Sequence, residues 1–345
     1  MESLPVPSVQ AMAGVGGAHV PARYLRPEVA ADAVAGDGET AIPIIDFQRL
    51  LHPEAGGDES ARLHGACQEW GFFQLINHGV PDGVMEGMKA SIQGFFELPS
   101  EIKQQFAQER GQLEGYGQLF VVSEDQKLDW ADILCMNTQP PQHRNMRFWP
   151  DTPAFRSTLD AYSAAVKNVA DRLLGIMSRN LGLHPEVIAN KCIIQSVRMN
   201  YYPPCAEADK VVGFSPHSDA DLLTLVLQVN EVQGLQIRRD DGTWVPVQPL
   251  QGAFVVNIGD ILQIFTNGRY RSIEHRAMIN AQRERLSIAA FHSPSIHATI
   301  GPLPDLLVAE REEMAIYKTL DHESFMRLFF SAKLEGKSFL KGMEL

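Results

Sequence analysis

After Pro185 the chain consists of short β-type runs separated by turn residues, and this pattern limits its fold most strongly. Asp240-Asp241-Gly242 is a clear hairpin turn between two of the runs. About eight short strands at this spacing predict a sandwich or jelly roll, the cupin-like double-stranded β-helix. The expected strands span 193–202, 222–228, 234–238, 244–248, 253–258, 262–266, 273–279 and 285–292.

The first half of the chain has mainly helical periodicity. Residues 152–183 form the clearest long helix, because apolar residues recur there at helical spacing. Short strands are expected at 42–47 and 71–76, helices at 58–70, 81–97, 100–107 and 311–334, the last ending at Gly336, and an irregular stretch at 111–150. The predicted fold class is α+β, a jelly-roll core with a mainly helical N-terminal region and a C-terminal helix.

Changes in composition and pattern divide the chain into five parts. Residues 1–40 are rich in Ala, Gly, Pro and Val, and we expect a flexible arm there. The other expected parts are an N-terminal region at 41–150, the long helix at 151–190, the jelly roll at 191–297 and a helical segment at 298–345.

The composition favours a protein that acts on small molecules. With 30 basic and 42 acidic residues the net charge is −12, which disfavours nucleic acid and anionic membrane surfaces as partners. The four cysteines contain no C-x-x-C pair, so we expect free thiols. Neither a targeting signal nor a long apolar run is evident, and we expect a cytoplasmic monomer that makes no membrane contact.

His217, Asp219 and His275 are the candidate metal ligands. Alternate residues of a strand share a face, so His217 and Asp219 would point to one metal, and His275 would arrive from a strand near the other end of the barrel. Two histidines and a carboxylate form a facial triad for non-haem Fe(II). The same three ligands with an open position also describe catalytic Zn²⁺.

Arg285 and Ser287 favour iron, because they suggest a co-substrate that carries a carboxylate. A guanidinium binds a carboxylate with two hydrogen bonds, and the hydroxyl adds another donor. If this face looks into the barrel, the buried charge needs an anionic partner; a surface Arg is the alternative. Phe291 continues the face as an apolar wall, and His292 on the other face would be structural. The face of a second strand carries Arg198, Asn200 and Tyr202, where Arg198 would contact the substrate or extend to the surface.

The motifs in this order resemble those of plant 2-oxoglutarate- and Fe(II)-dependent dioxygenases, nearest to the SRG-type and codeine-demethylase-like branch. The similarity covers roughly residues 40–340. It rests on N-Y-Y-P-P-C (200–205), S-P-H-S-D (215–219), S-I-E-H-R (272–276), R-L-S-I-A-A-F-H-S-P (285–294), W-G-F-F-Q-L-I-N-H-G-V (70–80), F-F-E-L-P (95–99), E-G-Y-G-Q (114–118) and L-D-W-A-D (128–132).

The resemblance implies that the three candidate ligands bind Fe(II) and that O₂ and 2-oxoglutarate are co-substrates. Arg285 and Ser287, helped by Tyr202 and with Asn200 nearby, would bind the distal carboxylate of 2-oxoglutarate. Ascorbate would keep the iron reduced, and His78 in N-H-G would be structural. Residues 41–150 become the N-terminal dioxygenase region, and 191–297 the catalytic jelly roll.

The expected reaction is hydroxylation, O-demethylation or desaturation of a small plant specialised metabolite or hormone-like molecule, coupled to formation of succinate and CO₂. Two alternatives are an oxidase that uses no 2-oxoglutarate, similar to aminocyclopropane carboxylate oxidases, and a cupin-like binding protein with a vestigial site. Asp221 would contact a polar substrate, face solvent or replace a ligand. The expected substrate residues are Phe291, Arg198, Asp221, Leu222, Ser293 and Tyr116.

Overall fold

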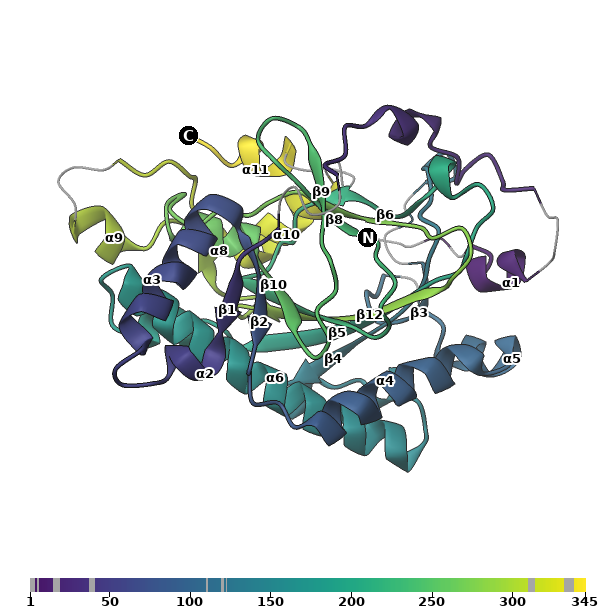
Figure 1. Cartoon of the computed structure of the whole chain (residues 1–345), viewed down its shortest axis with the longest axis horizontal. Coiled ribbons are helices and arrows are strands. Elements are labelled where there is room, and N and C mark those ends of the chain that lie inside the picture. Colours follow the sequence, from purple (N-terminus) through teal and green to yellow (C-terminus); the bar gives the residue numbers. More distant parts are fainter. Residues whose placement is uncertain are drawn as a thin grey trace.

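Two β-sheets face each other, and helices cover the outer face of the larger sheet (Figure 1). Residues from both sheets line a cavity between them. This computed structural model describes residues 4, 6–14, 19–36, 41–109, 111–118, 121, 123–309, 314–331 and 338–345. The arrangement confirms the predicted α+β class with a jelly-roll core.

The larger sheet draws strands from both halves of the chain. Its order is β1 (Ile44–Asp46), β2 (Phe72–Ile76), β10 (Phe254–Ile258), β7 (Leu223–Gln228), β12 (Arg285–Ser293), β5 (Ile194–Tyr202), β4 (Asp132–Gln139) and β3 (Gly115–Gly117). The described neighbours are antiparallel except for the parallel pair β1 and β2. The N-terminal region is mainly helical, as predicted, but its strands β1 to β4 extend the barrel sheet. In particular, β4 lies within the stretch expected to be irregular.

The smaller sheet carries two of the candidate ligands. Its order is β6 (Val212–His217), β11 (His275–Met278), β8 (Leu235–Arg238) and β9 (Trp244–Pro246). The predicted hairpin between β8 and β9 is confirmed, with Gly242 at a φ of +88°. Strand β6 lies at the edge of this sheet, where the backbone N–H of Trp130 donates to the carbonyl of Val212 at 2.8 Å.

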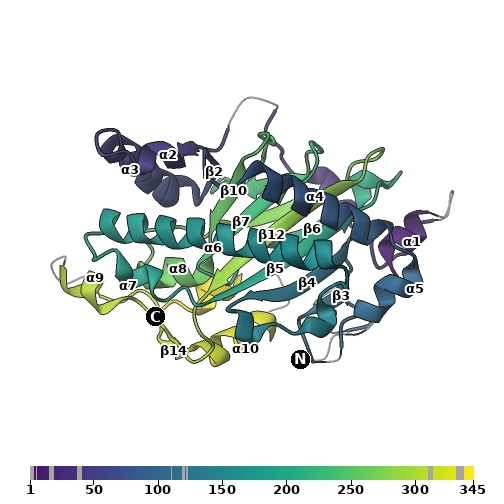
Figure 2. The same ribbon diagram turned by 90° about the horizontal axis from the view of Figure 1, so that it is seen from below.

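Helix α6 (Pro153–Asn180) is the expected long helix, and it lies with α4 across the larger sheet (Figure 2). The hydroxyl oxygen of Thr152 caps it by accepting from the N–H of Phe155 at 3.3 Å. The other helices are α1 (Val9–Ala13), α2 (Phe47–Leu50), α3 (Gly56–Gly65), α4 (Asp82–Glu97), α5 (Ser100–Lys103), α7 (Glu186–Ala189), α8 (Asp260–Phe265), α9 (Pro304–Ala309), α10 (His322–Ser331) and α11 (Ser338–Gly342). None of the described helices is both long and apolar enough to span a membrane.

Strand β12 separates the hydrophobic core from the central cavity. Leu286, Ile288 and Ala290 are buried in the core cluster that also contains the apolar face of α6. On the opposite face, Arg285 and Ser287 line the cavity. The period-two alternation predicted for this strand is therefore confirmed.

The strand expected at 262–266 is wrong, because these residues belong mainly to helix α8 (Asp260–Phe265). The run I-L-Q-I-F is almost wholly apolar and buried, and such a short run does not distinguish a strand from a buried helix. The backbone N–H groups of Asp260 and Ile261 donate to the carbonyls of Asp219 and Ala220 at 2.7 and 3.2 Å, so α8 also holds the turn that carries Asp219.

The C-terminal helix expected at 311–334 is shorter in the structure. Helix α10 covers 322–331, and just before it β14 (Leu320–Asp321) pairs with β13 (Thr299–Ile300). Residues 310–313 and 332–337, with the expected end at Gly336, lie outside the described residues. The pairing of β14 with β13 makes the helix begin later than expected, because this tertiary contact holds residues 320–321 in a strand and helical periodicity does not reveal it.

The described parts of the first forty residues do not form a loose arm, contrary to expectation. Val9 and Tyr24 are buried in a second apolar cluster, and the ring of Tyr24 meets that of Trp130 edge-on at 5.3 Å. The carboxylate of Asp132 accepts from the N–H groups of Val9 and Gln10 at 2.9 and 3.1 Å. The apolar residues of this segment have no periodicity, yet they pack against the rest of the protein, and composition alone does not predict this contact.

Replacing Asp132 with Asn should loosen this amino-terminal segment, because the amide turns an N–H donor toward groups that are themselves donors. We expect the free energy of unfolding to fall by about 1–3 kcal/mol. Deuterium exchange at the amides of Val9 and Gln10 should also become faster. The exposed Asp125→Asn is the matched control, and equal exchange in the two variants would contradict the role of Asp132.

Candidate active site

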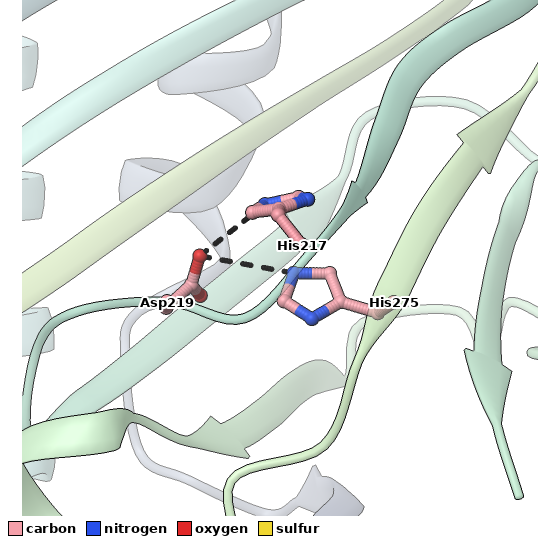
Figure 3. Close-up of side chains that lie close together, drawn as sticks. All are labelled: His217, Asp219 and His275. Atoms are coloured by element: carbon pink, nitrogen blue, oxygen red, sulfur yellow. Dashed lines mark ion pairs between the residues drawn. The ribbon is translucent and has the colours of Figure 1, made fainter. Parts of the chain in front are cut away.

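The three candidate ligands lie together, His217 and His275 through strand pairing and Asp219 through the turn after β6 (Figure 3). His217 ends β6 and His275 begins β11, and the two residues are partners in the antiparallel register. The Nε2 atoms of His217 and His275 lie 3.4 and 3.7 Å from Oδ1 of Asp219. His275 thus comes from the strand next to β6 and not from the other end of the barrel. Asp219 reaches the site through the turn after β6, so strand alternation was the wrong reason for its position.

Backbone carbonyls orient both imidazole rings. Nδ1 of His217 lies 2.9 Å from the carbonyl oxygen of Ser215, and Nδ1 of His275 lies 3.1 Å from that of Ile273. A carbonyl only accepts, so each Nδ1 carries the proton and each Nε2 keeps its lone pair. Nε2 of His217 is buried and has no hydrogen-bond partner, as expected of an atom that binds a metal.

The hydrogen bonds of Asp219 leave one carboxylate oxygen for the metal. Oδ2 accepts from the Thr224 hydroxyl at 2.6 Å and from the Asn257 amide at 2.9 Å. Oδ1 is the atom that faces both histidines (Figure 3). These bonds fix the carboxylate and direct Oδ1 to the point where the two Nε2 atoms converge.

The ionisation states also suit a metal site. Burial opposes ionisation of Asp219, but His275 and His217 outweigh it and hold the pKa of Asp219 well below its usual range. Burial and repulsion from His217 lower the pKa of His275 to about 4, with Asp219 acting in the opposite direction. At neutral pH the site therefore presents a carboxylate and a neutral imidazole, which are the forms that bind metal. The three residues form the only His, Cys, Asp and Glu cluster suited to a metal among the described residues.

A cavity next to the triad contains a buried, unpaired guanidinium. Arg285 is 3% exposed, and its Nη2 donates to Gln228 at 3.2 Å while its Nε has no hydrogen-bond partner. Among the described residues it makes no ion pair. Burial lowers the pKa of Arg285, with Tyr202 acting in the opposite direction, yet an arginine stays charged. Such a buried charge suits an anionic ligand.

The neighbouring strand supplies further polar groups to this cavity. Tyr202 is the register partner of Arg285, and the guanidinium carbon lies 5.1 Å from its ring centre. Asn200 is paired with Ser287, and its amide donates to the Ser287 hydroxyl at 3.2 Å. All four residues that the sequence suggested for co-substrate binding thus line one cavity with His217, Asp219 and His275.

A second pocket, of about 340 Å³, adjoins the triad. It shares His217 and Asp219 with the metal site, and its volume is that of a small-molecule pocket. Of the expected substrate residues, Phe291, Arg198 and Asp221 line it, and the Ser293 hydroxyl donates to the Asp221 carboxylate. Burial and the charge of Asp219 raise the pKa of Asp221 to about 7, while Ser293 and Arg198 act to lower it.

Leu222 and Tyr116 were wrongly expected in this pocket. Leu222 is fully buried in the main core, because it points away from its neighbour Asp221. Tyr116 is buried against Phe95 and Phe96, and its hydroxyl donates to Asp132 at 3.2 Å. Neither side chain is among those that line the pocket.

Sequence reasoning missed several lining residues. The missed residues include Glu114, Asn137, Ser196 and Phe214. Met326, Phe329 and Phe330 line the pocket from the C-terminal helix, which was expected to contribute to it. Parity was a usable signal for Ser196, which lies two residues before Arg198 on β5. No comparable signal marked Glu114, since it precedes a strand in a stretch that had no clear pattern.

Two other histidines have structural contacts, as expected. Nε2 of His78 lies 2.8 Å from the carbonyl oxygen of Gly252. His292 is fully buried on the core face of β12, with Nε2 3.0 Å from the Gln195 amide nitrogen. Neither belongs to the metal cluster.

Comparisons with known proteins agree with this geometry. Residues 193–294 match the 2OG-Fe(II) oxygenase superfamily, and residues 42–152 match the N-terminal region described as non-haem dioxygenase in morphine synthesis. S-norcoclaurine synthase 1 from Coptis japonica is 49% identical, and codeine O-demethylase from Papaver somniferum is 42% identical. Each comparison covers 99% of this chain and 97% of the relative.

A solved structure shows the same fold over the whole chain. The crystal structure of JOX2 in complex with 2OG, Fe and JA has a TM-score of 0.90 and is 33% identical, with 100% of both chains covered. The Fe and 2OG in that structure suit the ligand set and the buried guanidinium found in this chain. The chain therefore belongs to the 2OG-Fe(II) oxygenase superfamily, as a 2-oxoglutarate-dependent dioxygenase with His217, Asp219 and His275 as its iron-binding triad.

Proposed function

We propose that this enzyme hydroxylates a small, mainly aromatic plant metabolite and removes an O-methyl group when the hydroxylated carbon is a methoxy carbon. The observation that carries this proposal is the aromatic pocket beside the triad, where Phe214, Phe291 and Phe329 surround His217 and Asp219. A relative named for O-demethylation, codeine O-demethylase, supports the second outcome.

The buried guanidinium supports a specific site for 2-oxoglutarate. Arg285 would bind the distal carboxylate, with the hydroxyls of Ser287 and Tyr202 as further donors and the Asn200 amide holding Ser287 in place. The bare backbone of Gly234 leaves room for the arginine, since a Cβ there would lie 2.8 Å from Cδ of Arg285. Any larger residue at this position would displace the guanidinium.

The residues of the triad would leave coordination positions of the metal free, and the residues around it would orient the substrate. When bound, Fe(II) together with 2-oxoglutarate and O₂ supplies the power to oxidise a substrate C–H bond, with release of succinate and CO₂. His217, Asp219 and His275 would hold the metal, and a set of three protein ligands leaves further coordination positions for co-substrates. The aromatic walls exclude water and place the substrate beside the triad.

The reaction class can be tested with purified enzyme, Fe(II), ascorbate, 2-oxoglutarate and a plant metabolite extract. We expect mass spectrometry to show products that gain one oxygen atom or lose one methylene, and only when 2-oxoglutarate is present. Equal product formation without 2-oxoglutarate would contradict the proposal. The ascorbate requirement is tested by leaving it out of the same reaction.

The variant His217→Ala should lose Fe(II) binding and substrate-coupled succinate formation, because it removes an imidazole that the backbone orients. Loss of a partner one step beyond a ligand already weakens metal binding 10–100-fold, so we expect a decrease of at least about a hundredfold. Calorimetry with Fe(II) under anaerobic conditions measures the affinity. The exposed His297→Ala serves as the control, and full succinate production by His217→Ala would rule out the triad.

For Arg285→Ala we expect the apparent KM for 2-oxoglutarate to rise roughly 10- to 100-fold, because the variant loses a pair of charge-assisted hydrogen bonds to the carboxylate. Arg285→Lys should recover part of the affinity, because it keeps the charge but not the planar fork. Steady-state succinate assays over a range of 2-oxoglutarate concentrations measure both variants. Arg283→Ala, an exposed arginine two residues earlier, is the control. An unchanged KM in Arg285→Ala would exclude this site.

A further inference from the structure

Three charged side chains in the substrate pocket form no ion pair with any described residue. They are Glu114, Arg198 and Asp221, and all three are half-buried. They line the same pocket, together with the Cys135 thiol. Unpaired charges inside a small pocket usually meet their partner in the ligand.

Arg198 already has partners of another kind. Its guanidinium lies between two aromatic rings, with its central carbon 4.5 Å from the ring centre of Phe214 and 4.8 Å from that of Phe291. Each contact is a favourable cation–π interaction. The two carboxylates have no such compensation, since Glu114 accepts one backbone N–H bond from Asn137 at 2.7 Å and Asp221 accepts one bond from Ser293.

The backbone around Asp221 is fixed by close contacts. A Cβ on Gly259 would lie only 2.0 Å from the carbonyl oxygen of Asp221, so this approach requires glycine. Two backbone hydrogen bonds flank this contact. The N–H of Leu222 donates to the carbonyl of His292 at 2.8 Å, and the N–H of Gly259 donates to the carbonyl of Leu222 at 3.0 Å. The carboxylate is thus a preorganised acceptor that keeps free lone pairs after bonding to Ser293.

The cofactor site does not use these carboxylates. Asp221 is not part of the triad cluster. Arg276 in the cofactor cavity is paired with Asp32, and Arg198 lines both cavities. Of the remaining charges there, the two positive charges of Fe(II) and the one of Arg285 would balance Asp219 and the two carboxylates of 2-oxoglutarate. When both are ionised, the two carboxylates of the substrate pocket outnumber its one guanidinium, and a cationic group on the substrate would favour their ionised form and balance the excess.

We propose that the substrate carries a protonated nitrogen on an aromatic skeleton, with its N–H groups bound by Asp221 and Glu114. Its rings would pack against Phe214, Phe291 and helix α10. Asp221 is then a specificity-determining residue. This inference rests on the proposed function, because it takes the pocket beside the iron as the substrate site.

Three probes that share one skeleton test the charge preference: 2-(3,4-dimethoxyphenyl)ethylamine, 2-(3,4-dimethoxyphenyl)ethanol and 3,4-dimethoxyphenylacetate. Binding is measured by calorimetry at pH 7, under anaerobic conditions, with enzyme loaded with Fe(II) and 2-oxoglutarate. A charge-assisted hydrogen bond in a half-buried site should make the amine bind at least about tenfold more tightly than the alcohol or the acid.

The variant Asp221→Asn keeps the size of the side chain and an acceptor for Ser293 but removes the charge. We expect the preference for the amine over the alcohol to fall to less than about threefold. Glu114→Gln is a second variant, with a smaller expected loss, in case the first does not fold. The controls are Asp125→Asn and Glu231→Gln, two exposed carboxylates outside the pocket, and both should keep the wild-type preference.

Two results would overturn the inference. One is wild-type enzyme that binds the amine no better than the alcohol and the acid, including the case where none binds. The other is an unchanged preference in both Asp221→Asn and Glu114→Gln. Binding of 2-oxoglutarate is measured in the same samples: if it binds while the amine preference is absent, the substrate class is wrong but the proposed function stands, and if it fails to bind, the proposed function itself fails.

Discussion

The antiparallel register of β6 and β11 is the constraint on which the metal site depends. It places His217 opposite His275, and the bonds from each Nδ1 to a backbone carbonyl turn both Nε2 atoms to one side. Asp219 completes the set because its turn is tied to the start of helix α8. A shift of one residue in this register would reverse the side chains of one strand and separate the ligands.

The cofactor cavity follows from the neighbouring sheet in the same way. Strand β12 has one apolar face for helix α6 and one polar face for the cavity, so a single strand serves both core and chemistry. The buried charge of Arg285 destabilises the empty protein, and an anionic ligand relieves that cost. If Arg285 binds the co-substrate as proposed above, affinity for the co-substrate and stability of the fold are coupled at this residue.

Much of the site was predictable from sequence because it depends on strand parity and short motifs. Arg285, Ser287 and Phe291 share a face in the sequence and line the interior in the structure. The prediction failed where tertiary contacts decide. Helix α8 resembles a strand because its run is uniformly apolar, and the packed amino-terminal segment has no period to reveal its partner. Glu114 reaches the pocket from a distant loop, and its place depends on how β3 and β4 join the sheet.

The position of β6 at the edge of the smaller sheet has a consequence for solubility. An uncovered edge strand offers backbone groups to other chains and promotes aggregation. Here the N–H of Trp130 already bonds to the Val212 carbonyl, and the carboxylate of Asp129 accepts the N–H of Ser215 at 3.1 Å. The strand that carries an iron ligand is thereby protected from pairing with a second molecule, and the loop that protects it also keeps the ligand in register.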